Sequence, residues 1–132
     1  MSTLNVDALV GVSSANAITV RGEGTATTSL QQGLAKAWLQ YNQVTPTITG
    51  SNNISTVTDT SAGNSTTSFS NAMSALDYAV ASAGGMLNTD ASGRIAEVNP
   101  TNTSSYQVKT ANSAGALADH TGTSTATFGD LA

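Results

Sequence analysis

The chain of 132 residues contains no cysteine and is poor in aromatic and charged residues. Without cysteine it can form neither a disulfide framework nor a thiolate metal site. Only 9% of the residues are charged, the formal net charge is −4, and the four basic residues are scattered. An acidic chain without a basic stripe is not expected to bind nucleic acid.

Long hydrophobic runs are also missing from the sequence. No stretch approaches the roughly 18 apolar residues that a membrane span requires. The first residues lack the basic start and long apolar core of a signal peptide. We therefore expect neither membrane insertion nor export by the standard route.

Short stretches of β-branched residues, separated by turn-forming clusters, fill the chain after residue 34. This pattern predicts an all-β domain, with short antiparallel strands in a sandwich or a barrel. Residues 61–64 form a clear turn cluster between two such stretches and predict a hairpin. The expected strands cover 35–42, 47–49, 54–59, 65–69, 77–83, 94–98, 104–109 and 123–128, with a turn at 50–53.

The stretch 35–42 holds the only tryptophan and is the centre of the expected fold. A helix competes just before it, because Leu30, Leu34 and Trp38 recur at every fourth position. Gly33 would cost that helix about 1 kcal/mol relative to alanine. We predict one short helical turn near 28–33, with Thr28 or Ser29 as its N-cap, and a strand from residue 35 onward. The predicted core consists of Trp38, Leu39, Tyr41, Ile54, Val57, Phe69, Tyr78 and Val80.

The N-terminal segment 1–33 has too few apolar residues to bury itself, so we expect an extended docking arm. Two short strands around a turn at 13–16 are predicted within 2–20, followed by a flexible joint at 21–24. The predicted docking residues are its apolar side chains, Leu4, Val6, Leu9, Val10, Ile18 and Val20.

No catalytic or cofactor site emerges from the sequence. The single histidine, His120, lies in a polar stretch beside Asp119, and we interpret it as a solvated side chain. The carboxylates are singletons that form no close pair for acid–base work and no calcium loop. We expect no enzymatic activity, no cofactor and no metal.

The stretch 35–42 resembles the "AKAWVNFNG" signature of small tail-fibre or virion proteins of tailed bacteriophages. In that family an "NVSSITDNGTGDYTVNFTNAM…NYAV" block follows. A similar run occurs here in residues 53–59, 63–64, 68–73 and 77–80, and the first residues are similar to the family's "MSTLKV" start. Residues 43–50 and 65–67 depart from the family pattern.

The resemblance implies a β-sandwich that is usually trimeric in fibres, with no enzymatic residues. We therefore expect a homotrimeric virion protein, assembled in the host cytoplasm, that forms a short tail-fibre-like or appendage subunit. Its partners would be other phage virion proteins and, through exposed loops, a host surface glycan. The candidate receptor residues are Asn52, Asn53, Asn64, Asn88 and Asp90. A capsid decoration or cement protein is the alternative, and a polysaccharide depolymerase is a third hypothesis that the lack of paired carboxylates disfavours.

Overall fold

The structure is a computed structural model that describes residues 4, 6–12, 17–21, 25–84 and 94–132. The chain divides into two compact units, Met1–Leu34 and Ala35–Ala132. This boundary falls one residue after the division into 1–33 and 34–132 that the sequence predicts. The second unit contains most of the described strands, which form two antiparallel sheets.

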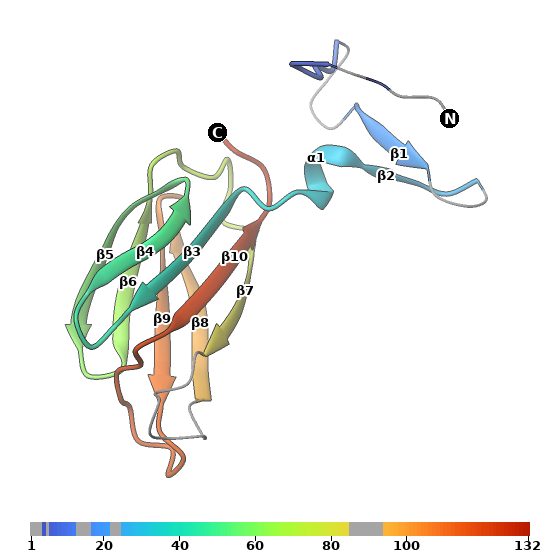
Figure 1. Cartoon of the computed structure of the whole chain (residues 1–132). Helices are drawn as coiled ribbons and strands as arrows, with labels where there is room; N and C mark the ends of the chain where they lie inside the picture. Colours follow the sequence, from blue (N-terminus) through green and yellow to red (C-terminus); the bar gives the residue numbers. More distant parts are fainter. Residues whose placement is uncertain (1–3, 5, 13–16, 22–24, 85–93) are drawn as a thin grey trace. The chain divides into compact units, whose positions relative to one another are not determined.

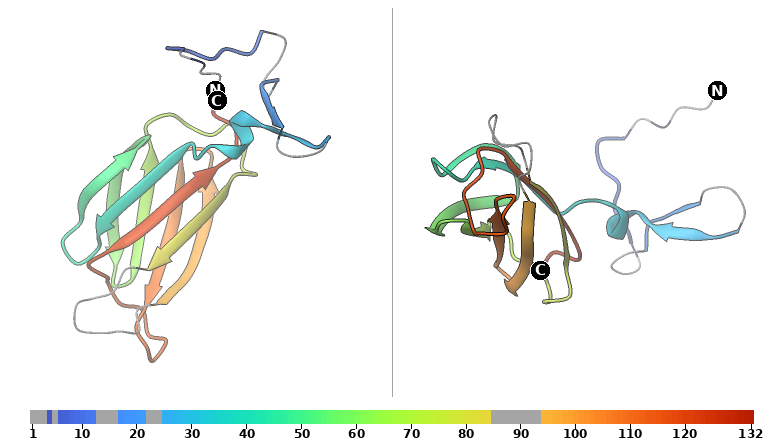
Figure 2. Two further views of the ribbon diagram at one scale, coloured as in Figure 1. Left: turned by 45° about the vertical axis from the view of Figure 1, so that its right-hand side comes forward. Right: turned by 90° about the horizontal axis from the view of Figure 1, so that it is seen from below.

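The two sheets of the second unit pack face to face (Figures 1 and 2). One sheet has the strand order β4 (Thr47–Asn52), β3 (Ala37–Asn42), β10 (Thr123–Phe128), β7 (Ala79–Gly84). The other has the order β5 (Ile54–Ser61), β6 (Asn64–Phe69), β9 (Ser105–Ala111), β8 (Arg94–Asn102). All neighbouring strands are antiparallel, which confirms the predicted all-β, sandwich-like fold.

Burial alternates along the inner strands, as expected where one face of a strand points into a sandwich. Alternate residues of β3, β6, β9 and β10 are buried. Many of these buried side chains carry hydroxyl groups, so hydrogen bonds cross the interior. The Tyr41 hydroxyl lies 2.6 Å from Ser65 Oγ, and the Tyr106 hydroxyl lies 2.6 Å from Thr125 Oγ1.

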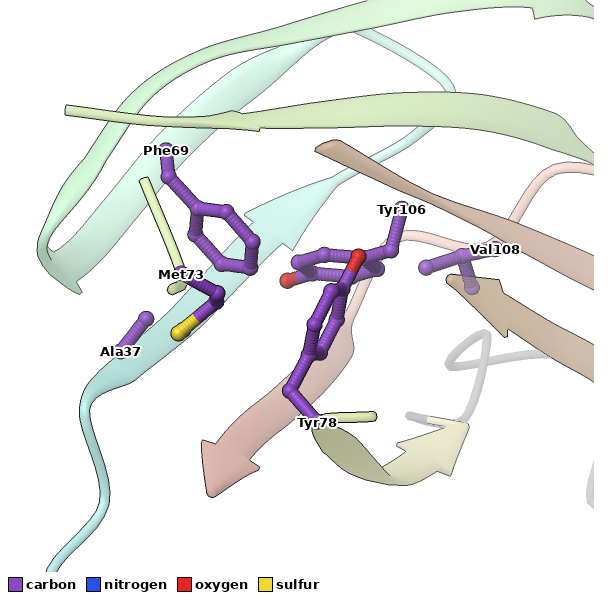
Figure 3. Packing of buried hydrophobic residues seen from close by; sticks show 6 residues of the cluster. All are labelled: Ala37, Phe69, Met73, Tyr78, Tyr106 and Val108. Carbon is purple, nitrogen blue, oxygen red and sulfur yellow. The ribbon is translucent and has the colours of Figure 1, made fainter. Parts of the chain in front are cut away.

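The hydrophobic core gathers between the sheets around three aromatic rings (Figure 3). The Phe69 ring packs edge-on against Tyr78, with centroids 5.6 Å apart, and lies 5.4 Å from the Tyr106 centroid. Such tilted and edge-to-face pairs are the favoured aromatic arrangements. The cluster consists of Ala37, Phe69, Met73, Tyr78, Tyr106 and Val108, with Ile54, Val80 and Val98 packed against it.

The predicted core residues divide into three groups by exposure. Leu39, Tyr41, Phe69 and Tyr78 are buried. Ile54, Val57 and Val80 are half-buried. Trp38 does not lie in the core, because its side chain is 45% exposed on the opposite face of β3.

Two predicted turns lie inside strands. β4 continues through residues 50–52, because these positions pair with β3, and only Asn53 adopts a left-handed turn conformation, with φ of 55°. β8 runs through Pro100, in the gap that was expected between the predicted strands 94–98 and 104–109. Proline is tolerated there because β8 is an edge strand that pairs only with β9 among the described residues.

The first unit contains β1 (Thr19–Arg21), β2 (Thr27–Ser29) and the single turn of α1 (Leu30–Gly33). Ser29 caps α1, with its hydroxyl accepting from the Gln32 amide at 3.3 Å, so the predicted helical turn is confirmed. β1 pairs with β2, which follows it in the chain. Of the two strands predicted within 2–20, the second overlaps β1, although β1 pairs with β2 and not with an earlier strand. The first is not seen, because residues 6–12 form no strand, and the predicted turn at 13–16 lies outside the described residues. An isolated two-stranded sheet is marginally stable, so this unit gains little from its own packing.

Candidate functional site

The first candidate surface is the outward face of the sheet β4–β3–β10–β7, where Trp38 lies. Ala37, Leu39 and Tyr41 alternate with Trp38 along β3 and take the inner positions. The Trp38 ring lies over the backbone of Gly50 on β4. A β-carbon at Gly50 would come within 3.2 Å and 3.3 Å of two ring carbons, so only glycine leaves this space open.

Small side chains continue this surface beyond Trp38. The register aligns Ala126 of β10 with Trp38 on one side and with Ala81 of β7 on the other. Ser124 is aligned in the same way with Gln40 and with Ala83. We call this set the outer face: Trp38, Gln40, Ala81, Ala83, Ser124 and Ala126.

A shallow, open depression of about 290 Å³ lies over the β10 and β7 part of the outer face. Its lining residues are Ala81, Ser82, Ala83, Ser124, Thr125 and Ala126, and none of them is charged. It holds no nucleophile with a base and no paired carboxylates, so it fits contact with another chain better than chemistry.

The second candidate is a buried polar cluster where β3, β9 and the segment before β10 meet. Gln43, Thr110 and His120 are each almost fully buried. The Thr110 hydroxyl lies 2.7 Å from Gln43 Oε1 and 2.7 Å from the Ala118 carbonyl, and its one proton can serve only one of them at a time.

The prediction that His120 is a solvated side chain is wrong, because 1% of the residue is exposed. Its Nε2 lies 3.1 Å from the Ala111 carbonyl, and since a carbonyl only accepts, Nε2 carries the proton in the neutral ring. Its Nδ1 has no hydrogen-bond partner among the described residues, and neither has Gln43 Nε2. No local pattern in the sequence indicates this burial, because the hydrogen-bond partner Gln43 is 77 residues away in the chain.

The neighbouring Asp119 anchors a turn rather than activating the histidine. Its carboxylate accepts the Gly63 amide at 2.6 Å. Gly63 in turn accepts the Thr110 amide at 2.8 Å, so one residue ties the β5–β6 turn to β9. The hydrogen bonds of this cluster therefore hold together segments that are far apart in the sequence.

The buried tyrosines are equally unsuited to catalysis. Burial raises the pKa of Tyr41 to about 12, against an opposing hydrogen bond from Ser65. Burial also raises the pKa of Tyr106, while hydrogen bonding by Thr125 opposes the rise. The phenols stay protonated near neutral pH and serve as hydrogen-bonding groups of the core.

The structure separates the predicted receptor residues instead of bringing them together. Asn52 and Asn53 lie where β4 ends and β5 begins, and the Asn53 side chain bonds to Asn71. Asn64 lies after the other end of β5 and contacts Ser61 at 2.9 Å. Eight residues of strand separate the two loops, which is roughly 25 Å at about 3.3 Å per residue. Asn88 and Asp90 lie outside the described residues.

The predicted docking residues of the N-terminal unit are largely exposed. Leu4, Val6, Leu9, Val10 and Val20 expose half or more of their surface, and Ile18 is half-buried. Sequence reasoning missed Val12, which is fully exposed. Its signal was the even-numbered apolar series Leu4, Val6, Ala8, Val10 and Val12, which has the period of a strand.

Comparison with protein-family models, with curated proteins and with solved structures gave no match. Within the described residues, no helix is long and apolar enough to cross a membrane. The same part of the chain has no group of three or more histidine, aspartate or glutamate residues that could hold a metal ion.

Proposed function

We propose that this protein is a structural subunit of a tailed-bacteriophage virion, a short tail-fibre-like or appendage protein that has no enzymatic activity. In this proposal it is a homotrimer that joins the particle through its N-terminal segment 1–33 and contacts other virion proteins. It binds no nucleic acid, inserts into no membrane and needs no cofactor.

The observation that carries the proposal is the exposed apolar series of the N-terminal unit. Leu4 exposes 79% of its surface and Val10 exposes 76%, and Val6, Leu9 and Val20 each expose more than half. Water-exposed apolar side chains on a segment without a core of its own are stabilised when another surface covers them. The resemblance of residues 35–42 and 53–80 to phage tail-fibre and virion proteins supplies the identity of that surface.

The experiment is the copy number of the protein in purified particles, measured by quantitative mass spectrometry against the major capsid protein. A ratio of a few per cent is expected for a tail or vertex appendage. The proposal requires that the protein is detected in washed particles, and its absence from them would refute the virion proposal.

The same measurement separates the alternative, a capsid decoration or cement protein. The described residues of the second unit form two packed sheets and include no long shaft, which favours a decoration protein. A ratio near one, or a large simple fraction of one, would establish this alternative and exclude the fibre.

The proposal also includes binding of a host surface glycan. The candidate receptor residues lie in two separate loops, so each loop needs its own test. Because Asn53 and Asn64 lie at opposite ends of β5, the loops at 52–53 and 61–64 belong to separate candidate sites. Each loop should be exchanged in its own variant phage and adsorption compared with the parent. Unchanged adsorption in both variants would refute glycan binding through these loops.

A further inference from the structure

The edge strand β7 differs from the other edges of the sandwich. β4, β5 and β8 each pair with their neighbour through at least one register shift, and β8 also carries Pro100. β7 pairs with β10 over six consecutive residues without a shift. Among the described strands, it is the sandwich edge that has an unbroken register.

The composition of β7 also leaves this edge unprotected. Natural edge strands resist pairing with other chains through charges, prolines, bulges or short length. The six residues Ala79–Gly84 include no charge and no proline. Ala81, Ser82 and Ala83 are exposed, and in the described residues β7 pairs with no strand other than β10. β7 can therefore accept a further strand through its backbone.

Residues 6–12 of the N-terminal unit have the pattern of such a strand. In extended form, Val6, Ala8, Val10 and Val12 would share one face. All four are exposed, and none of them belongs to a strand of this structure. The segment is seven residues long, which matches the six residues of β7.

We propose that residues 6–12 of one copy add as a strand to the free edge of β7 in a neighbouring copy. The valine row would extend the alanine row of Ala79, Ala81 and Ala83 on the outer face. On the opposite face of β7, Val80 already packs against the core of its own copy and Ser82 is polar. An open depression without charged residues already lies beside this row. The contact is head-to-tail, so three copies can close a ring.

This inference deepens the proposed function, because it names the contact that holds the trimer together. In this arrangement the neighbouring copy covers residues 6–12, so Leu4, Ile18 and Val20 are the predicted docking residues outside this contact that remain for the particle. The test uses isolated protein and no virions, so its failure is distinguishable from a failure of the virion assignment, which the copy number decides.

The first test compares oligomeric mass by sedimentation equilibrium of the full chain and two pairs of variants. The wild type should approach three times the 13.2 kDa of one chain. The double variant Val6→Asp/Val10→Asp should associate at least about tenfold more weakly, because a carboxylate cannot be buried unpaired. Its control, Thr25→Asp/Thr28→Asp, adds the same charge to exposed positions of the same unit outside 6–12.

The second pair of variants tests β7, the strand that would receive residues 6–12. Ala81→Lys places a charge on the outer face of β7, and Asn52→Lys does the same on β4, the opposite edge of the same sheet. Only Ala81→Lys should weaken association, again by about tenfold or more. Far-UV circular dichroism verifies that both variants fold. A monomeric wild type, or association that survives both Val6→Asp/Val10→Asp and Ala81→Lys, would overturn the proposal.

Disulfide trapping gives an independent measurement, because the chain has no cysteine of its own. Ala81→Cys is combined in turn with Val6→Cys, Val10→Cys and Val12→Cys. Facing residues of paired strands have β-carbons about 4.5–5.5 Å apart, so one combination should cross-link between chains far faster than the others. Cross-links formed only within one chain, or equally by all three combinations, would contradict the proposal.

Discussion

Replacement of Gly63 by alanine should be among the most damaging single-methyl changes in this protein. Gly63 has φ of +69°, a conformation that costs an L-residue about 1–2 kcal/mol. The added β-carbon would lie 2.5 Å from the Thr110 carbonyl oxygen and 2.6 Å from the Ala118 amide nitrogen. Both atoms belong to the backbone, so the segments around them would have to separate.

That separation would break the hydrogen bonds that Gly63 makes on both sides. The Thr110 amide donates to the Gly63 carbonyl at 2.8 Å, and the Gly63 amide donates to the Asp119 carboxylate at 2.6 Å. A neutral bond contributes about 1 kcal/mol and one to a charged group about 1.5–3 kcal/mol. Together with the backbone strain, Gly63→Ala should lower the free energy of unfolding by about 4 kcal/mol.

Gly115→Ala is the matched control, because Gly115 has φ of +85° but no atom within 4 Å of an added β-carbon. Gly115→Ala should lower the free energy of unfolding only by the backbone strain of the left-handed conformation, about 1–2 kcal/mol. Urea unfolding of both variants, followed by far-UV circular dichroism, measures the difference. Equal losses in the two variants would refute the packing of Gly63 against Thr110 and Ala118.

Three further predictions test the interior. Leu39→Ala should cost about 3 kcal/mol in urea unfolding because Leu39 is buried, whereas Trp38→Ala should cost about 1 kcal/mol because Trp38 is 45% exposed. Tyr106→Phe should cost about 2 kcal/mol, since Thr125 loses its buried partner, and adding Thr125→Val should restore most of it. The third prediction concerns alkaline titration. Burial raises the pKa of Tyr41 from an ordinary 10.0 to about 12, so between these pH values the folded state keeps a proton that the unfolded state releases. This contribution to stability is intact below pH 10 and is lost as the pH rises toward 12, so phenolate absorbance should appear together with unfolding.

Each of these predictions has a contradicting outcome. A larger loss from Trp38→Ala than from Leu39→Ala would mean that the two faces of β3 are exchanged. A double variant of Tyr106 and Thr125 that costs the sum of its single changes would mean that their hydroxyls do not interact. Phenolate absorbance of all three tyrosines near pH 10 in the folded protein would show that Tyr41 is not buried.

The sequence by itself determined the class of fold and many of its elements. β-branched stretches between turn clusters predicted β5, β6 and β10 closely, because strand period and turn chemistry are local properties. The helical turn of α1 followed in the same way from the cap at Ser29. The exposed apolar series of the first unit could also be read from its two-residue period, although Val12 was missed.

Only the tertiary structure decided which face of each strand is buried and which distant groups meet. β3 carries large side chains on both faces, so its local pattern fits either orientation. Packing against the other sheet, where the Tyr41 hydroxyl meets Ser65 of β6, placed Leu39 inside and Trp38 outside. His120 is buried for the same reason, because Gln43 and Ala111 come from other parts of the chain. The candidate residues Asn53 and Asn64 are separated because they flank opposite ends of β5. Burial and proximity depend on contacts between residues far apart in sequence, which no local pattern contains.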